Sequence, residues 1–432
     1  MKNTSLSIQE IHQLYKEKKL TPYELTLQSL SYAKNDDNNA FEYISEKEAL
    51  EIASNLKEFD ESKPLWGIPF SIKDNYSTKD IPTTGSSNIL NGYIPVYDSE
   101  VYKKLIAAGA IPIGKTTLDE LAMGGSGVSG HLGKTFNPWD KKHLHQVGGS
   151  SCGSAACVAN SITPFSIGSD TGDSVRKPAS YAGLVGFKPT WGRISRYGLF
   201  PFAPSLDHVA YFTRNVYDSA LILNVLAGRD DKDLTSSFEP VDNYTSEIGK
   251  DIKGVRIAVI SEILDSISNQ NIISAFKESL IDLEKSGATI NYVHMNLDLL
   301  KAIYPAYIII SCSEATSNNA NLDGIKFGPR PKGNTYQEVM TNARTQGFSE
   351  LIKRRFVIGS YSLYRENQND LYLNAKRARR LIVNAINDIL NENDFIYVPA
   401  SPTTAPLFNS SSDRLSDEYL IADNHLAIGN FA

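Results

Sequence analysis

Residues 148–182 read GGSSCGSAACVANSITPFSIGSDTGDSVRKPASYA, a stretch in which glycine and serine alternate with apolar runs such as AACVA and ITPFSI. Flexible linkers are also rich in glycine and serine, but they do not contain apolar runs of this kind. The wider region 124–198 has the same character, and its only acidic residues are Asp140, Asp170 and Asp173. We therefore expect closely packed turns inside a core.

The composition of the whole chain is that of an ordinary globular protein. Hydrophobic residues make up 41% of its 432 residues and charged residues 21%, which excludes disordered, collagen-like and coiled-coil proteins. The 43 basic and 49 acidic residues leave a net charge of −6, which argues against a surface devoted to nucleic acid but permits a local basic patch. Length alone suggests roughly three domains of about 150 residues.

The cysteines and the N-terminal residues bear on the cellular compartment. Three cysteines without a C-x-x-C pair are too few for a disulfide framework and suit a reducing cytoplasm. The first twenty residues lack the apolar core of a signal peptide, and no run approaches 18 apolar residues. We therefore expect a cytoplasmic protein without a membrane segment.

Short apolar runs separated by helix-like segments indicate an α/β protein. Such alternation is typical of a mixed or parallel sheet with helices packed against it. One helix is expected at 271–285, and another begins at Thr21-Pro22, where Glu24 completes a capping box. The runs expected as strands are 68–72, 110–113, 162–167, 255–260 and 395–398.

Three segments match known motifs by letter, but their context argues against each motif. Residues 109–116 (GAIPIGKT) fit the P-loop pattern, yet a helix-like segment precedes them and Pro112 removes a backbone donor. Residues 125–130 (GSGVSG) fit the dinucleotide-binding pattern but also follow a helix-like segment. Residues 149–153 (GSSCG) fit a nucleophile elbow centred on Ser151, although the segment before them is too polar for a buried strand.

The histidines give no sign of a metal centre. His143 and His145 are the only close pair, and they lie in the polar stretch KKHLHQ. No H-E-x-x-H motif and no cluster of acidic residues with histidine accompanies them. We therefore expect no metal site in this chain.

A lysine and two serines could instead carry covalent chemistry. Lys73 ends the apolar run FSIK, Ser150 lies in GGSSCGS, and Ser174 lies in GSDTGDS. Taken singly, these would be a surface lysine, a flexible loop and a turn. Taken together they favour a serine nucleophile, because a lysine that burial keeps neutral can accept its proton and a second hydroxyl can relay it.

At these segments the chain resembles the amidase signature family. GGSSCGSAACVA is similar to the family's glycine- and serine-rich signature, GSDTGDSVRKPA to its nucleophile segment and GIPFSIKDN to its lysine motif. The resemblance implies an α/β amidase signature fold, with a large mixed β-sheet covered by helices on both faces, as a single amidase domain over residues 1–432. It also implies that Lys73 is the base, Ser150 the bridging serine held by a cis peptide, and Ser174 the nucleophile.

The resemblance also assigns an oxyanion site, at which this sequence departs from the family. The backbone N–H groups of Thr171, Gly172 and Asp173 are expected to hold the oxyanion. The family usually has glycine where this chain has Asp173, so we expect this side chain to point away from the oxyanion or to meet a cation such as Arg176. The other departure is Cys152, which replaces a signature glycine and requires a negative φ.

A closer resemblance connects the chain to one branch of the family, the A subunits of tRNA-dependent amidotransferases. It rests on GRISRYGLFPFAPSLDHVAYFTR, on LDGIKFG and on residues 347–355. This branch implies a glutaminase that supplies ammonia to convert Glu-tRNA(Gln) to Gln-tRNA(Gln), and in many cases Asp-tRNA(Asn) to Asn-tRNA(Asn). It also implies that Tyr307, Arg355 and Asp423 hold the free glutamine.

The same resemblance implies partners. A B subunit would bind the misacylated tRNA and use ATP and magnesium, a small C subunit would complete a heterotrimer, and the present chain would need no cofactor. Three alternatives remain open: a stand-alone amidase, a catalytically decayed scaffold subunit, and a nucleotide-binding protein using residues 109–116. Because the chain stops in the apolar run LAIGNFA, where the subfamily continues, a C-terminal truncation is also expected.

Overall fold

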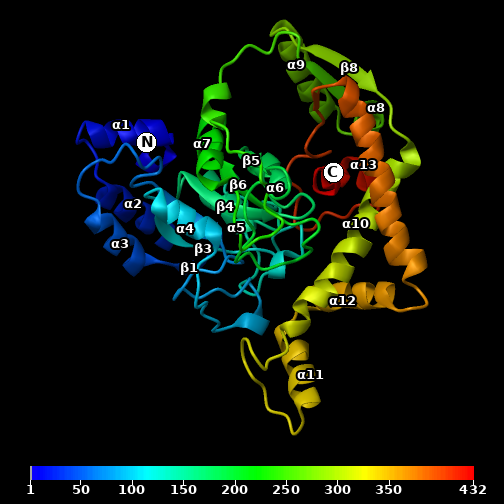
Figure 1. The fold of residues 1–432 in the computed structure, drawn as a ribbon, viewed down its shortest axis with the longest axis horizontal. Coiled ribbons are helices and arrows are strands. Elements are labelled where there is room, and N and C mark those ends of the chain that lie inside the picture. The colour runs from blue at the N-terminus through cyan, green and yellow to red at the C-terminus, as the bar shows by residue number, and fades with distance from the viewer. Residues whose placement is uncertain (1) are drawn as a thin grey trace.

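The computed structural model describes residues 2–432, and a six-stranded mixed β-sheet occupies its N-terminal half (Figure 1). The strand order is β1-β3-β2-β4-β6-β5, in which β2 runs parallel to β3 and β4 while the other neighbours are antiparallel. The strands are β1 (Phe41–Ile44), β2 (Pro69–Lys73), β3 (Ile111–Thr116), β4 (Phe165–Asp170), β5 (Val185–Phe187) and β6 (His208–Thr213).

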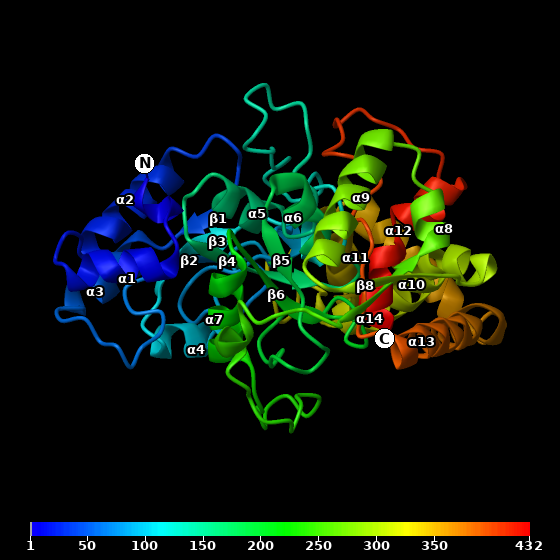
Figure 2. The same ribbon diagram turned by 90° about the horizontal axis from the view of Figure 1, so that it is seen from above.

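Helices cover both faces of this sheet, as expected (Figure 2). They can do so because side chains alternate between the two faces along each strand. On one face, Phe70 and Ile72 of β2 share a core with apolar residues of α1, α2, α4 and α7. On the other, β6 packs against α5 and α6 through Ala210 and Phe212. These helices are α1 (Ile8–Lys16), α2 (Pro22–Lys34), α3 (Glu46–Asn55), α4 (Glu100–Ala107), α5 (Cys152–Ala159), α6 (Arg176–Ala182) and α7 (Val216–Leu226).

The C-terminal half is mainly helical and carries a second, smaller sheet. Its strands β7 (Arg256–Ile260), β8 (Thr289–Val293) and β9 (Phe395–Ile396) are parallel in the order β8-β7-β9. The long α10 runs beside α12 and α13, and α11 projects from the body (Figure 1). The helices are α8 (Ser261–Asp265), α9 (Gln270–Lys285), α10 (Leu297–Asn318), α11 (Tyr336–Gly347), α12 (Glu350–Leu363), α13 (Asn374–Glu392) and α14 (Ile428–Phe431).

One hydrophobic core joins the two halves. Ile303 and Ile310 of α10 and Ile352 of α12 belong to the same buried cluster as Leu121 and Phe202 of the N-terminal half. A core of this kind holds elements that are far apart in the sequence in fixed relative positions, because burial removes their apolar surface from water. Residues on α10 and α12 are therefore placed firmly against the N-terminal half.

The expected elements are largely confirmed. Each of the five apolar runs overlaps a strand, and the helix expected at 271–285 is α9. At the start of α2 the side chain of Thr21 accepts a hydrogen bond from the backbone N–H of Glu24, and Glu24 reaches back to Thr21, which is the predicted capping box. The largest difference is the last run, of which only Phe395–Ile396 is a strand.

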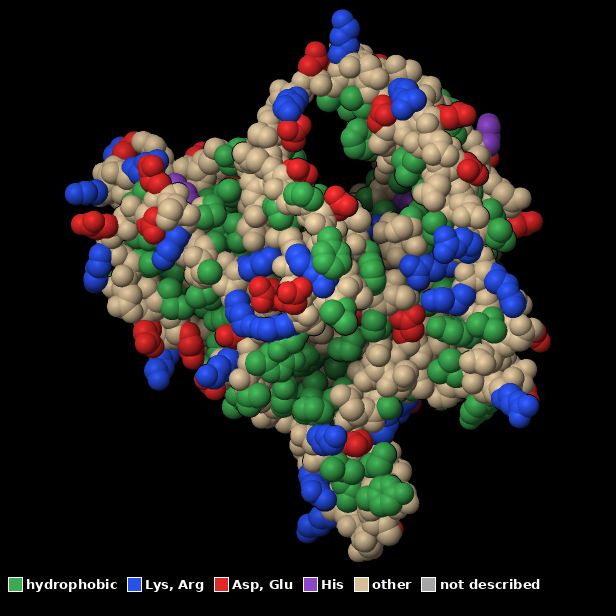
Figure 3. All heavy atoms as spheres, viewed as in Figure 1, with side chains coloured by type: hydrophobic (Ala, Val, Ile, Leu, Met, Phe, Trp, Pro, Cys, Tyr) green, Lys and Arg blue, Asp and Glu red, His purple; other side chains and the backbone are tan. Residues whose placement is uncertain are grey.

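The surface also has regular features. Lys and Arg side chains gather over α13, whose sequence contains Lys376, Arg377 and Arg380 (Figure 3). Along α12, large apolar side chains are exposed, and Val357 is 68% accessible and Tyr361 57%. Within residues 2–432 no helix has the length and apolar character needed to cross a bilayer.

Candidate active site

The side chain of Lys73 is the centre of the candidate site. It projects from the end of β2 and is fully buried. Its Nζ donates hydrogen bonds to Ser150 Oγ at 2.8 Å, Ser151 Oγ at 2.9 Å and Ser169 Oγ at 2.9 Å. The main-chain oxygen of Ser169 lies farther away, at 3.4 Å. No carboxylate of the described residues lies within ion-pair distance of this amine, although its surroundings are polar.

Burial changes the proton affinity of Lys73. Because loss of solvent disfavours the charged form, the pKa of Lys73 falls to about 7. Burial was expected to keep this lysine neutral, and burial is the largest cause of the lowered pKa. The immediate neighbours are hydroxyl groups, so the lowered pKa follows from burial without a counter-ion rather than from apolar contacts.

Ser150 lies between two anchored segments. Its peptide bond with Gly149 is cis, as the resemblance implied. Its main-chain oxygen accepts a hydrogen bond from the N–H of Asp119 at 3.1 Å. Gly149 has no room for a side chain, since a methyl group built on it would lie 2.1 Å from Oδ2 of Asp119. The position of Ser150 is therefore fixed by Asp119 on one side and by Lys73 on the other.

Ser174 follows β4 in a turn that leads into α6. It is 3% exposed, and its main-chain oxygen accepts a hydrogen bond from the N–H of Ser151 at 3.2 Å. Within the described part of the chain its hydroxyl makes no hydrogen bond, so the contact with Ser150 that a proton relay needs is not closed here. The fold brings Lys73, Ser150 and Ser174 into one region, with only the Lys73–Ser150 hydrogen bond formed.

The turn before Ser174 presents unused backbone donors. Across residues 2–432 no acceptor is found for the N–H groups of Thr171, Gly172, Asp173 and Ser174. Buried backbone N–H groups are almost always paired, so four consecutive free donors beside a serine hydroxyl suit an anionic oxygen. The first three of these residues are those for which an oxyanion site was predicted.

A buried ion pair supports this turn. Arg176 Nη2 lies 2.8 Å from Asp170 Oδ1 and also donates to the main-chain oxygen of Gly172 at 2.8 Å. Burial alone would raise the pKa of Asp170, but the adjacent guanidinium lowers it well below its ordinary value. The same guanidinium binds the C-terminal segment, donating to the main-chain oxygen of Leu426 at 2.7 Å and to Asn430 Oδ1 at 2.6 Å.

Asp173 meets a cation, but the cation is Lys177 rather than Arg176. The distance from Lys177 Nζ to Asp173 Oδ2 is 2.8 Å. Lys177 also donates to Asp423, at 2.5 Å to its main-chain oxygen and at 3.1 Å to Oδ1. Arg176 is unavailable to Asp173 because Asp170 holds it. The predicted oxyanion residue Asp173 and the predicted glutamine-binding residue Asp423 thus share one lysine.

The other two predicted glutamine-binding residues lie on neighbouring helices. Tyr307 of α10 packs on the oxyanion turn so closely that a methyl group on Gly172 would lie 2.8 Å from its Cζ. Arg355 of α12 has its guanidinium over the ring of Phe202, 5.7 Å from the ring centre. Its Nε and Nη1 atoms are buried without a hydrogen-bond partner among the described residues. A buried guanidinium with unpaired donors suits a carboxylate ligand.

Cys152 is compatible with the site. It is the first residue of α5, outside the left-handed region, as its replacement of glycine requires. Its thiol is buried, accepts a hydrogen bond from Thr135 Oγ1 at 3.3 Å, and has its pKa raised to about 12 by burial. The thiol is therefore unreactive and fills space beside Gly127.

The P-loop match has a structural explanation. Residues 111–116 form strand β3 rather than a loop, as the context indicated. Lys115 is 1% exposed and donates to the main-chain oxygen of Tyr76 at 2.9 Å and to Thr83 Oγ1 at 2.7 Å. It also lies 3.3 Å from Asp74 Oδ1. A lysine committed to buried internal partners cannot bind phosphate, so the nucleotide-binding hypothesis is wrong for this segment.

The glycine-rich loop at 125–130 binds a carboxylate of the protein itself. Asp119 accepts hydrogen bonds from the N–H groups of Ser126, Gly127, Val128 and Ser129 at 2.9–3.1 Å, and from Ser129 Oγ at 2.8 Å. Such a loop can cradle an anion, and here the anion is internal. The dinucleotide-binding pattern was therefore coincidental.

Ser151 is not the centre of a nucleophile elbow. No strand precedes it, and it forms the N-terminal boundary of α5. Its hydroxyl donates to the main-chain oxygen of Ser169 at 3.0 Å while it accepts from Lys73. Sequence reasoning missed Ser151 and Ser169 as partners of Lys73, although both lie in the two serine-containing segments that it singled out.

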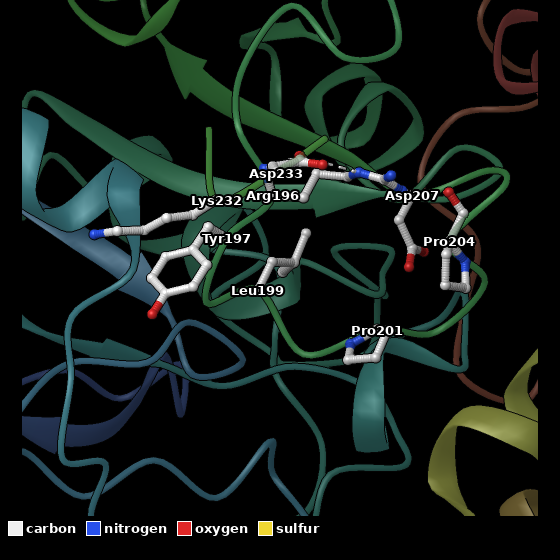
Figure 4. Close-up of a pocket in the computed structure, with 8 residues that line it drawn as sticks. All are labelled: Arg196, Tyr197, Leu199, Pro201, Pro204, Asp207, Lys232 and Asp233. Atoms are coloured by element: carbon white, nitrogen blue, oxygen red, sulfur yellow. Dashed lines mark hydrogen bonds and ion pairs between the residues drawn. The ribbon is translucent and has the colours of Figure 1, made fainter. Parts of the chain in front are cut away.

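A cavity of about 210 Å³ lies near the site but does not include it (Figure 4). Its wall residue Asp207 accepts a hydrogen bond from Thr171 Oγ1 at 2.7 Å, so the cavity and the oxyanion turn share a wall. Lys73, Ser150 and Ser174 do not line it. The lining residues are Arg196, Tyr197, Leu199, Pro201, Pro204, Asp207, Lys232 and Asp233.

The close pair of histidines, His143 and His145, contacts other side chains of the protein. His145 Nδ1 lies 2.7 Å from Asp140 Oδ2, and His143 stacks on Phe136. Among the described residues no group of three or more His, Cys, Asp or Glu side chains could hold a metal ion.

Comparison with known proteins places this geometry in a family. The family model described as amidase matches residues 24–430. The A subunit of glutamyl-tRNA(Gln) amidotransferase from Pediococcus pentosaceus is 40% identical over 425 residues, covering 97% of this chain and 87% of that protein. The protein of the same name from Macrococcus caseolyticus is 43% identical over 404 residues, covering 92% and 83%. The crystal structure of the corresponding A subunit from Thermotoga maritima matches with a TM-score of 0.78 and 33% identity, covering 99% and 86%.

Proposed function

The chain belongs to the amidase family of enzymes, and on that premise we propose that it is the glutamine-hydrolysing subunit of a tRNA-dependent amidotransferase. In this function it supplies ammonia for the conversion of Glu-tRNA(Gln) to Gln-tRNA(Gln). Whether Asp-tRNA(Asn) is also an acceptor is decided by the partner subunit that binds the tRNA. One observation carries the proposal furthest. Lys73 is a fully buried amine, 2.8 Å from Ser150, with no counter-ion and with a pKa of about 7.

Such a lysine can act as a general base at neutral pH. Neutral Lys73 accepts a proton from Ser150, which accepts one from Ser174, and the Ser174 Oγ attacks the side-chain amide carbon of glutamine. The free N–H groups from Thr171 to Ser174 stabilise the oxyanion of the tetrahedral intermediate. The open distance between the two serines is compatible with this relay, because catalytic hydrogen bonds often tighten only when substrate binds.

Collapse of the intermediate completes the first half of the reaction. Lys73 returns a proton through Ser150 to the leaving nitrogen, the C–N bond breaks, and ammonia departs. A γ-glutamyl ester remains on Ser174. Water activated by the same pair then hydrolyses the ester and releases glutamate, so each group returns to its starting protonation state.

The α-carboxylate and α-ammonium of glutamine would bind on the side of the 171–174 turn that faces α10 and α12. Arg355 has buried, unpaired Nε and Nη1 donors for the α-carboxylate. Tyr307 packs against Gly172 and closes the site near the oxyanion donors. Asp423 accepts from the α-ammonium, although its carboxylate already contacts Lys177.

The proposal includes partner subunits. A B subunit would bind the misacylated tRNA and use ATP and magnesium, and a small C subunit would complete the cytoplasmic heterotrimer, so no cofactor is needed in this chain. The exposed apolar residues of α12 support a protein partner, because Val357, Ile358 and Tyr361 are 68%, 40% and 57% accessible and fall at helical spacing. Tyr364, which follows the end of the helix, is 59% accessible. Co-purification of this chain with a B-like subunit, and loss of it in Val357→Asp/Tyr361→Asp, would test the partnership.

Glutamine hydrolysis by the purified complex tests the function. The wild-type complex should release ammonia from glutamine, and Ser174→Ala should lower the rate at least 10⁴-fold, in the range observed when a catalytic serine is removed. Full activity in Ser174→Ala would contradict the mechanism. No activity in the wild-type complex would favour a decayed scaffold subunit.

Arg355 separates the glutaminase of an amidotransferase from a stand-alone amidase. Arg355→Ala should reduce kcat/KM for glutamine at least 100-fold more than kcat/KM for propionamide, because only glutamine presents a carboxylate to the guanidinium. Arg354→Ala, an exposed neighbour on the same helix, is the matched control. Equal losses for both amides in Arg355→Ala would point to a general amidase.

A further inference from the structure

Three charged side chains from two distant segments meet directly beside the nucleophile. Lys177 Nζ contacts Asp173 Oδ2 at 2.8 Å, Asp423 Oδ1 at 3.1 Å and the main-chain oxygen of Asp423 at 2.5 Å. An ammonium has three N–H donors, so these contacts saturate it. The side chain of Lys177 is only 8% exposed, and burial alone would lower its pKa, but the two carboxylates raise that pKa above its ordinary value. Lys177 is therefore charged at neutral pH.

This cluster is formed by Asp173, Lys177 and Asp423. Burial raises the pKa of Asp173 above its ordinary value, and the ammonium of Lys177 opposes that shift. With both carboxyl groups ionised, the cluster carries one net negative charge. Without Asp173, the pair of Lys177 and Asp423 would be neutral, and it would offer no net attraction to a substrate cation. The ammonium of Lys177 cancels the negative charge of Asp423. The carboxylate of Asp173 supplies a second negative charge, so the cluster as a whole stays negative. The side chains of Asp173 and Asp423 are 22% and 30% exposed, and Lys177 forms its ion pairs with one oxygen of each, Oδ2 of Asp173 and Oδ1 of Asp423.

The cluster also lies where a substrate cation would be needed. Asp173 is adjacent to Ser174 in the chain, and Gly172 before it touches Tyr307. The unpaired Arg355 donors mark the place for a carboxylate on the α12 side. An α-amino acid whose side chain reaches Ser174 carries one α-carboxylate and one α-ammonium. The α-carboxylate suits the guanidinium of Arg355, and the α-ammonium suits the negative cluster.

We propose that Asp173 and Lys177 are specificity-determining residues, and that the substrate's α-ammonium is recognised by Asp173 and Asp423 jointly, with Lys177 as their internal counter-ion. The inference rests on the proposed glutaminase function and refines it. It predicts that neutralising one member of the Asp173–Lys177 pair disturbs recognition of the ammonium, and that neutralising both restores it.

The test compares glutamine with glutaramate, which has the same side-chain amide and carboxylate but no ammonium. Hydrolysis of each amide is measured with the purified complex of this chain and its B-like subunit, and the ratio of the two kcat/KM values is calculated. Asp173→Asn should lower the glutamine-to-glutaramate ratio at least tenfold, because the remaining cluster is neutral. The double variant D173N/K177Q should return the ratio to within threefold of the wild type. Asp394→Asn, which breaks the surface ion pair with Arg256, is the control and should leave the ratio unchanged.

An unchanged ratio in Asp173→Asn, or a double variant no better than the single one, would overturn the inference. If the double variant fails to fold, Lys177→Arg provides a second check, since it keeps the charge and should keep the ratio within threefold. A purely structural role would lower both kcat/KM values together. Loss of glutamine hydrolysis in the wild-type complex itself would instead contradict the proposed function and leave no ratio to compare.

Discussion

Two lysines on neighbouring strands occupy contrasting pockets. Lys73 ends β2, and Lys115 lies on the adjacent β3, beside Ile72 in the pairing of the two strands. Both are at most 1% exposed, and both donate to hydroxyl groups and a main-chain oxygen. Only Lys115 has a carboxylate beside it, that of Asp74 at 3.3 Å.

The difference shows how one carboxylate changes the use of a buried amine. A buried charge is stabilised by an opposite charge nearby, so Lys115 and Asp74 form an internal pair whose value is structural. Lys73 has only neutral oxygens around it, which can accept from the ammonium but can also donate to the neutral amine. The first pocket favours a fixed ion pair, and the second permits proton transfer.

The strongest way to separate the two pockets is to remove each amine in turn. Lys73→Met should lower kcat for glutamine by about 10²–10⁴-fold, since a general base contributes an effect of this size. The fold should persist, because the variant leaves hydroxyl groups rather than a charge in the pocket. Ammonia release and a thermal melt check both parts, and an unchanged kcat would show that Lys73 is not the base.

Lys115→Met should act on stability instead. Removing one partner of a buried ion pair leaves the other uncompensated, which costs about 3–5 kcal/mol of unfolding free energy. Denaturant unfolding measures this loss, and the double variant K115M/D74N should recover most of it because no unpaired charge remains. Kinetics of the folded fraction should stay near the wild type. Equal stability of Lys115→Met and the wild type would remove the contrast between the pockets.

The pH profile sharpens the comparison. In the proposed mechanism neutral Lys73 is the active form. Because its pKa is about 7, kcat/KM should fall about tenfold per pH unit below 7 and level off above it. Buried His208 and His425, whose pKa values burial lowers to about 3 and 4, stay neutral throughout this range. Lys188 also has a pKa lowered to about 7 by burial, so Lys188→Met is the control. If kcat/KM of Lys188→Met no longer fell below pH 7, the titrating group would be Lys188 rather than Lys73.

The smallest expected effect comes from the hydroxyl lining. Ser151→Ala removes an acceptor 2.9 Å from Lys73 Nζ. Since that oxygen stabilises the ammonium, its loss should lower the pKa of Lys73 further and move the acid limb of the pH profile to lower pH. The plateau rate should fall by no more than about tenfold, within the effect of one lost hydrogen bond. A limb displaced to higher pH would contradict the assigned donor and acceptor roles.

Much of this arrangement could be predicted from the sequence, because it depends on local pattern. Strand β2 and its terminal Lys73 follow from an apolar run with a polar end, and the P-loop match at 109–116 was recognised as misplaced from the helix-like residues before it. The partner of Asp173 could also have been found. Lys177 is four residues along on a helix, the spacing at which side chains meet.

The rest depends on contacts between distant segments. Arg176 was the expected partner of Asp173, but it binds Asp170 and Asn430 instead. Asn430 is 254 residues from Arg176 in the sequence. Ser151 and Ser169 reach Lys73 only because β2 and β4 are paired and α5 begins beside them. The anion held by residues 125–130 is Asp119, which no local pattern distinguishes from a bound phosphate. Pairing of this kind is decided by the packed fold.

The bond between Arg176 and the C-terminal segment has a consequence in time. A ribosome adds roughly 5–20 residues per second, so roughly 13 to 50 s pass between synthesis of Arg176 and of Asn430. During that interval Ser174, the proposed nucleophile, has been synthesised, but the contacts of Arg176 with Leu426 and Asn430, which support the turn before Ser174, cannot yet form. We therefore expect the turn that carries Ser174 to gain these supporting contacts only after Asn430 has been synthesised.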